Sequence, residues 1–328
     1  MPGFTGEAGA ALAFLIGYLA IFVWMLFLFL TQRIKWASRY TLLFFHVTIR
    51  VASQACGIGF GILGFTNTNL FLAFLILSAE GYFSLVLCAF RFLISWQQHN
   101  LLSGQSWLEP PDPPNTNRSR RFFAFLFLGP FAFILYPRNP MVGLHSALLL
   151  ANVCIIIGGS YLAGADYSDP DLPDTKRRLQ ISKITRTTGQ SVFLLGNALL
   201  LVLILATMRN NRRDGDSRSK TGTIHPTLWL LLLAWFPLIV RGVFGILQAA
   251  VYSLSYFNPA NYRASGFTHR FTIIEYLLGV LTEWLACVIL NLTFFTSMRD
   301  PKRVKLQNGD EGAGDHGLAH PHKNQVAI

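Results

Sequence analysis

Polar and ionisable side chains are rare within the hydrophobic runs of this sequence, and most of them recur at helical spacing. The candidates are His46, Arg50, Gln54, Glu80, Arg241, Glu275, Glu283 and Asn291. Steps of four residues place the first three on one helix face, and the last three form a seam along another helix, with Gly279 and Cys287 filling the steps of four between them. Charged groups in hydrocarbon are costly and turn toward partners or a water-filled cavity. We therefore expect these side chains to meet inside a helix bundle.

Two interpretations of such a cluster stay open at this point. Arg50, Glu80, Arg241 and Glu283 lie roughly halfway along their hydrophobic runs and therefore at similar depth. They can line a polar pocket for a ligand, ion or proton, or they can form interhelical ion pairs that fix the register of the bundle. The sequence alone does not separate the two.

Several common chemistries lack their residues here. The hydrophobic runs contain no lysine for a retinal Schiff base, and the chain has no paired-aspartate cluster, no His/Glu metal motif and no phosphate-binding glycine loop. The histidines of the C-terminal tail lack metal-ligand geometry and are expected in a solvated segment. We expect no metal and no cofactor.

The elements that position the candidate residues are seven hydrophobic runs, each long enough to cross a bilayer. They cover residues 9–31, 40–64, 70–95, 141–163, 189–208, 227–254 and 271–298. Hydrophobic residues make up 52% of the chain and charged residues only 13%, which is far from a soluble composition. The expected fold is an all-α, polytopic transmembrane bundle spanning residues 1–298.

The distribution of basic residues predicts an orientation. Seven crossings with the N-terminus outside place sixteen basic residues on the cytoplasmic side and seven outside, whereas counting 122–136 as an eighth crossing gives thirteen and ten. Residues 96–138 are then a cytoplasmic loop with 122–136 interfacial or re-entrant, 176–186 lie in an outer loop, and 299–328 form a disordered cytoplasmic tail. Because the net charge of +11 gathers at the ends of the runs, no nucleic-acid partner is expected.

Three stretches carry a family resemblance: Trp235–Arg241 (WFPLIVR), Ile156–Ser160 (IIGGS) and Glu275–Glu283. They resemble a fungal family of seven-helix integral membrane proteins whose domain has no assigned function, over most of residues 9–298. The resemblance implies a fungal source and seven helices, but no substrate and no catalytic residue. Such families also occur beside secondary-metabolite pathways.

The leading functional hypothesis is a protein that binds, senses or moves a lipophilic small molecule through a cavity lined by the intramembrane charges. The alternative is a membrane-embedded enzyme, such as a metal-independent terpene cyclase with a protonated glutamic acid as general acid. A seven-helix receptor is a second alternative. Enzymatic activity is not favoured, the expected location is the plasma membrane or the endoplasmic reticulum, and the oligomeric state is left open.

Overall fold

A computed structural model describes residues 5–101, 105–109, 139–162, 173–218, 224–263 and 266–297. Within this part of the chain, seven helices are long and apolar enough to cross a membrane, which confirms the predicted all-α membrane bundle. The long helices are α1 (Gly6–Leu30), α2 (Arg39–Leu63), α3 (Thr68–Asn100), α6 (Pro140–Leu162), α7 (Pro173–Arg218) and α8 (Pro226–Ala250). The last span combines α9 (His269–Ile274), the π-helix η4 (Glu275–Val280) and α10 (Leu281–Ser297).

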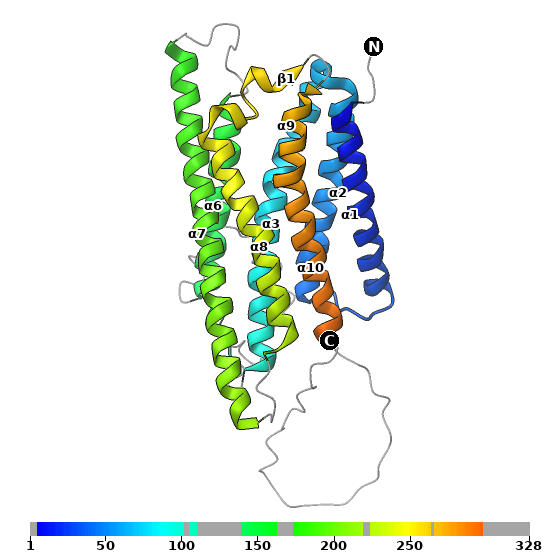
Figure 1. The fold of residues 1–328 in the computed structure, drawn as a ribbon, viewed down its shortest axis with the longest axis vertical. Coiled ribbons are helices and arrows are strands. Elements are labelled where there is room, and N and C mark those ends of the chain that lie inside the picture. The colour runs from blue at the N-terminus through cyan, green and yellow to red at the C-terminus, as the bar shows by residue number, and fades with distance from the viewer. Residues whose placement is uncertain are drawn as a thin grey trace, which may run out of the picture.

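Short elements connect these spans at one end of the bundle. They are η1 (Gly64–Asn67), η2 (Tyr252–Leu254), η3 (Pro259–Asn261) and the antiparallel strands β1 (Tyr262–Arg263) and β2 (Gly266–Phe267). Figure 1 shows β1 at the same end of the bundle as the start of α1. A buried carboxylate links α1 to β2 at this end. Glu7 at the start of α1 accepts a hydrogen bond of 3.2 Å from the backbone N–H of Phe267.

The helices stand side by side along the long axis, and α3 occupies the middle of the bundle (Figure 1). It contacts α2, α6, α7, α8 and α10. Helices satisfy their own backbone hydrogen bonds and can therefore face lipid with apolar side chains. Leu30 is 71% exposed and Leu195 is 70% exposed, which fits contact with hydrocarbon rather than with water.

The fifth span is longer than the sequence predicts. The charge rule places residues 176–186 in an outer loop, but α7 begins at Pro173 and continues for 46 residues. At about 1.5 Å per residue it is roughly 69 Å long and exceeds a hydrocarbon core of ~30 Å. Lysine and arginine are good helix formers, so their charge marks the membrane boundary without ending the helix.

Two predicted segments, the interfacial stretch 122–136 and the tail 299–328, lie outside the described residues. The chain on either side of the first is described. The backbone N–H of Met141 donates to the carbonyl of Leu108 at 3.0 Å. The chain therefore leaves and re-enters the described part at neighbouring positions.

Candidate functional site

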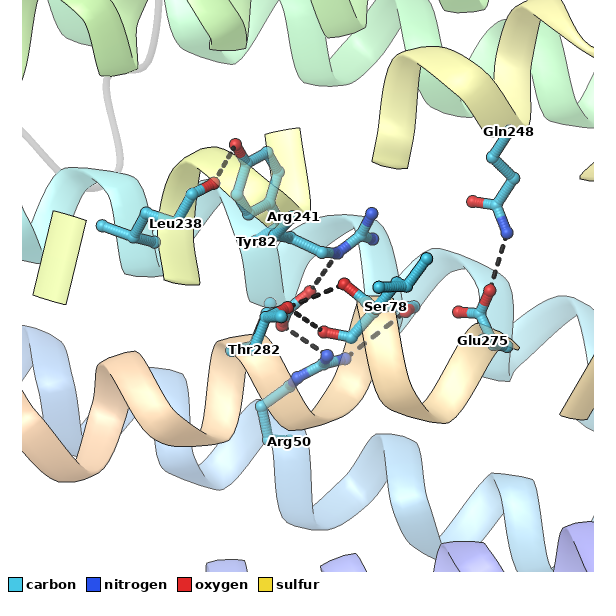
Figure 2. A network of polar contacts seen from close by, with 12 residues as sticks. Arg50, Ser78, Tyr82, Leu238, Arg241, Gln248, Glu275 and Thr282 are labelled. Carbon is cyan, nitrogen blue, oxygen red and sulfur yellow. Dashed lines mark hydrogen bonds and ion pairs between the residues drawn. The ribbon is translucent and has the colours of Figure 1, made fainter. Parts of the chain in front are cut away.

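A buried ion-pair triad joins three helices at the centre of the bundle. The Arg241 Nε on α8 donates to Glu283 Oε1 on α10 at 2.7 Å, and Arg50 on α2 forms an ion pair with Glu283 Oε2. All three side chains are buried, and the Glu283 carboxylate is fully so. Figure 2 shows Arg241 and Arg50 approaching the turn that carries Thr282 from two sides. One carboxylate thus serves two guanidinium groups.

Residues of α3 and α7 hold the two arginines in place. Arg50 Nη1 donates to Ser78 at 3.4 Å, and its carbon stem lies over Gly81, where an added Cβ would be 2.7 Å from Arg50 Cδ. The Arg241 guanidinium lies 5.1 Å from the ring centre of Tyr82, a favourable distance for a cation–π contact. Tyr82 in turn accepts a hydrogen bond of 2.6 Å from Asn197. Five helices therefore contribute to one polar network.

The remaining predicted polar residues lie apart from this triad. Glu275 accepts a hydrogen bond of 2.7 Å from the side-chain amide of Gln248. Figure 2 shows this pair to the side of the triad. Glu80 accepts from Asn152 at 2.7 Å and joins α3 to α6 instead of reaching an arginine. The predicted set therefore divides into one triad and several separate contacts.

Three further candidates are not placed in the triad either. His46 contacts the Gly81 carbonyl at 2.9 Å and joins α2 to α3, whereas Asn291 donates to the carbonyl of Cys287 in its own helix at 3.0 Å. Gln54 is fully buried, and neither polar atom of its side chain has a hydrogen-bond partner among the described residues. None of these arrangements brings reactive groups together.

A cavity opens beside the triad, between α3, α6, α7 and α8. Its volume is about 70 Å³. One wall is aliphatic and formed by Leu72, Leu75, Ile76, Ile155 and Ile156. The other side is polar and includes Ser78, Ser160, Arg186, Gln190, Arg241, Gln248 and Tyr256. Leu72 on α3 and Ser160 on α6 are the exposed members of these two groups, so we place the mouth between these helices.

Two arginines lie on the polar side of the cavity. Arg241 and Arg186 both line it, and no Asp or Glu is among its described lining residues. Arg186 is nearly buried: its Cγ lies where a Cβ on Gly158 would be only 2.7 Å away, and its guanidinium is 5.2 Å from the ring centre of Phe257. Burial, followed by the negative charge of Glu275, raises the pKa of Tyr256 well above its ordinary value, so this phenol stays neutral.

Several cavity residues were missed by the sequence reasoning. The charge rule places Arg186 in a loop, and the search for intramembrane charges does not identify Gln190, Gln248 or Tyr256. A signal existed in the spacing of Arg186, Gln190 and Asn197, which lie within three helical turns on one side of α7. Gln248 likewise follows Arg241 by seven residues on α8. Gln54 and Asn291 follow a predicted intramembrane charge by four or eight residues, whereas Gln248 follows Arg241 by seven and Gln190 follows an arginine that the charge rule places in a loop. The spacing rule therefore does not identify Gln190 and Gln248.

Metal binding and relatives add no further assignment. Within the described ranges, no group of three or more His, Cys, Asp or Glu side chains is placed to hold a metal ion. Comparison with protein-family models, with curated proteins and with solved structures finds no match to this chain.

Proposed function

We propose that this multi-pass membrane protein binds a lipophilic small molecule in the cavity between α3, α6, α7 and α8, in order to sense or transport it. The observation that carries the proposal is the division of the cavity into an aliphatic wall and a polar side. Small-molecule sites are mostly apolar concavities with a few placed polar groups. The plasma membrane and the endoplasmic reticulum are the proposed locations.

The proposed fungal family fits the same cavity. The stretch Trp235–Arg241 ends in a cavity residue, and Ile156, Gly159 and Ser160 from the second stretch line the opposite side. Two of the three stretches that carry the resemblance therefore contribute residues to the cavity lining, whereas Glu275–Glu283 does not. A fungal origin and a link to secondary metabolism are part of this proposal.

The proposed orientation puts the N-terminus outside and the C-terminus in the cytoplasm. The basic residues support it, since sixteen lie on the proposed cytoplasmic side against seven outside. The geometry is compatible, because the start of α1 and the end of α10 lie at opposite ends of the bundle (Figure 1). A protease-cleavable tag after Ile328 in sealed microsomes should be digested without detergent; protection of the tag in intact microsomes refutes the orientation.

The enzyme alternative receives less support from the geometry. A cyclase that starts its reaction by protonation needs a carboxylic acid at the substrate. None of the described lining residues is Asp or Glu, and Glu283 is already engaged by Arg50 and Arg241. We therefore propose binding rather than catalysis.

Filling the cavity tests the proposal directly. Ile156 lines the cavity, whereas its neighbour Ile157 is 56% exposed on the outer surface of the same helix. We expect Ile156→Trp to lower labelling of the cavity by photoactivatable lipophilic probes, here diazirine derivatives of a 16-carbon alcohol and a 16-carbon acid, by about tenfold, as steric exclusion from a packed site requires. The matched variant Ile157→Trp should label as wild type does. Equal labelling of the two variants would refute the site.

A further inference from the structure

Two buried polar atoms of the cavity lining have no hydrogen-bond partner among the described residues. One is a donor, Nη1 of Arg241 on α8, and the other is an acceptor, Oε1 of Gln190 on α7. Arg241 already uses its Nε in the bond to Glu283. Leaving a donor or an acceptor buried and unpaired is costly, and a ligand that bonds both atoms removes that cost.

The free donor and the free acceptor lie on the same face of α8. A Cβ added to Gly245 would overlap with Gln190 Oε1, so this oxygen packs directly against α8. Gly245 follows Arg241 by four residues, which places it one helical turn further along the same face. Figure 2 shows the terminal nitrogens of Arg241 turned away from the Arg50 side, toward the side on which Gln248 lies. A donor and an acceptor therefore face one space.

The charged groups around this space are already engaged with one another. Arg241 shares the Glu283 carboxylate with Arg50, and the negative charge of Glu275 also acts on it. Arg186 lines the cavity as well, but its guanidinium lies 5.2 Å from the centre of an aromatic ring. The requirement that remains is for hydrogen bonds rather than for a counter-charge.

The size of the cavity suits a small head group. Water takes about 30 Å³ per molecule in the liquid, so a volume of about 70 Å³ holds only a few groups of that size and no long chain. The mouth lies between α3 and α6, where Leu72 and Ile156 are apolar. A chain attached to a bound head group leaves through this mouth along these two residues.

We infer that the ligand of this cavity is an amphiphile with an uncharged hydroxyl head, which accepts from Arg241 Nη1 and donates to Gln190 Oε1 while its chain leaves between α3 and α6. The inference rests on the proposed function and names its ligand class. A hydroxyl is both a donor and an acceptor. A carboxylate only accepts, so it leaves Gln190 unpaired, and the charge of Glu275 opposes it in a low-dielectric site.

The test uses a graded series of photoactivatable probes that bear a diazirine in the chain. An alkane offers no polar contact, a methyl ether with as many heavy atoms as the 16-carbon alcohol offers only an acceptor, and the alcohol offers an acceptor and a donor. The 16-carbon acid is the charged member, and all labelling is done at about pH 9, where it is ionised. Purified full-length protein in phosphatidylcholine nanodiscs is labelled, and adducts on cavity peptides are measured by mass spectrometry.

Each step of the series reports one contact. We expect about tenfold more adduct from the ether than from the alkane, for a bond to charged Arg241, and about fivefold more from the alcohol than from the ether, for a bond to Gln190. The acid should label less than the alcohol. An alcohol that labels no better than the ether, or an acid that labels as well as the alcohol, overturns the hydroxyl head but keeps the proposed function. Absence of adducts from every probe overturns the proposed function itself.

A variant on α7 assigns the acceptor. Gln190→Leu removes Oε1, so the ratio of alcohol to ether labelling should fall to about one as that hydrogen bond is lost. Thr188→Val is the control, because Thr188 is exposed on the same helix and does not line the cavity, and it should keep the wild-type ratio. If Gln190→Leu also keeps the wild-type ratio, Gln190 does not accept from the ligand and the inferred head group is wrong.

Discussion

The triad and the cavity lie side by side and use their charges in opposite ways. In the triad, the Glu283 carboxylate meets a guanidinium at each oxygen, and all three groups are buried. In the cavity, Arg241 Nη1 and Gln190 Oε1 are buried and have no hydrogen-bond partner among the described residues. Paired charges hold helices together, whereas polar atoms without a partner are available to a ligand.

Arg241 belongs to both regions, which explains why the two interpretations of the sequence could not be separated. Its Nε donates a hydrogen bond to Glu283 and so links α8 to α10. The same side chain lines the cavity, where its Nη1 has no hydrogen-bond partner among the described residues. One side chain therefore supplies a structural ion pair and a candidate binding group. A structural role and a binding role can therefore belong to different atoms of one side chain.

The largest expected effect comes from neutralising the triad. Glu283→Gln leaves two buried guanidinium groups without a counter-charge, and breaking a buried pair in this way costs about 3–5 kcal/mol. We expect a corresponding loss in the free energy of unfolding, measured by SDS titration in bicelles. Glu80→Gln is the control, because Asn152 can still donate to the amide oxygen at that position. Similar losses in both variants would show that the triad is not a special contributor to stability.

A smaller loss is expected where Arg50 crosses the backbone of α3. Gly81→Ala places a Cβ 2.7 Å from Arg50 Cδ and must shift a side chain that Glu283 holds. Overpacking of this kind costs about 1–3 kcal/mol. Gly159→Ala is the matched control, since the nearest atom to its Cβ is Phe257 Cζ at 4.0 Å. If Gly81→Ala unfolds no earlier than Gly159→Ala in the same titration, Arg50 is not fixed as described.

The smallest effect on stability is expected on the cavity side. Gln190→Leu removes an amide whose Oε1 has no described partner, so the free energy of unfolding should change by less than about 1 kcal/mol. Binding of the 16-carbon alcohol should weaken, which competition against the alcohol probe measures. A loss of stability as large as that of Gly81→Ala would assign Gln190 to the structural region instead.

The bundle itself could be predicted because long uncharged runs such as 9–31 have no alternative in a bilayer. The pairing of Arg50, Arg241 and Glu283 was within reach of sequence reasoning, since similar depth and opposite charge draw them together. Partner choice was not, because Glu80 lies at similar depth yet bonds Asn152, an uncharged residue of α6. Rotation of each helix about its axis decides such choices, and packing of the whole bundle sets that rotation.

The cavity was harder to foresee than the triad for a related reason. It depends on α7 remaining helical through Arg186, which the charge rule places in a loop. It also depends on Tyr256 and Phe257, which follow α8 and close one end of the space. No spacing within one hydrophobic run reports a contact between a helix and a distant loop.

The central claim is that Arg241 works on both of its sides, and Arg241→Lys tests it most directly. Lysine keeps the positive charge but cannot bind Glu283 and a ligand oxygen through a rigid fork. Stability and the ratio of ether to alkane labelling are measured on one nanodisc preparation. The account predicts that both fall, the labelling ratio by about fivefold, in line with loss of a hydrogen bond to a charged group. A variant that loses stability yet keeps the wild-type ratio would contradict it and leave Arg241 a purely structural residue.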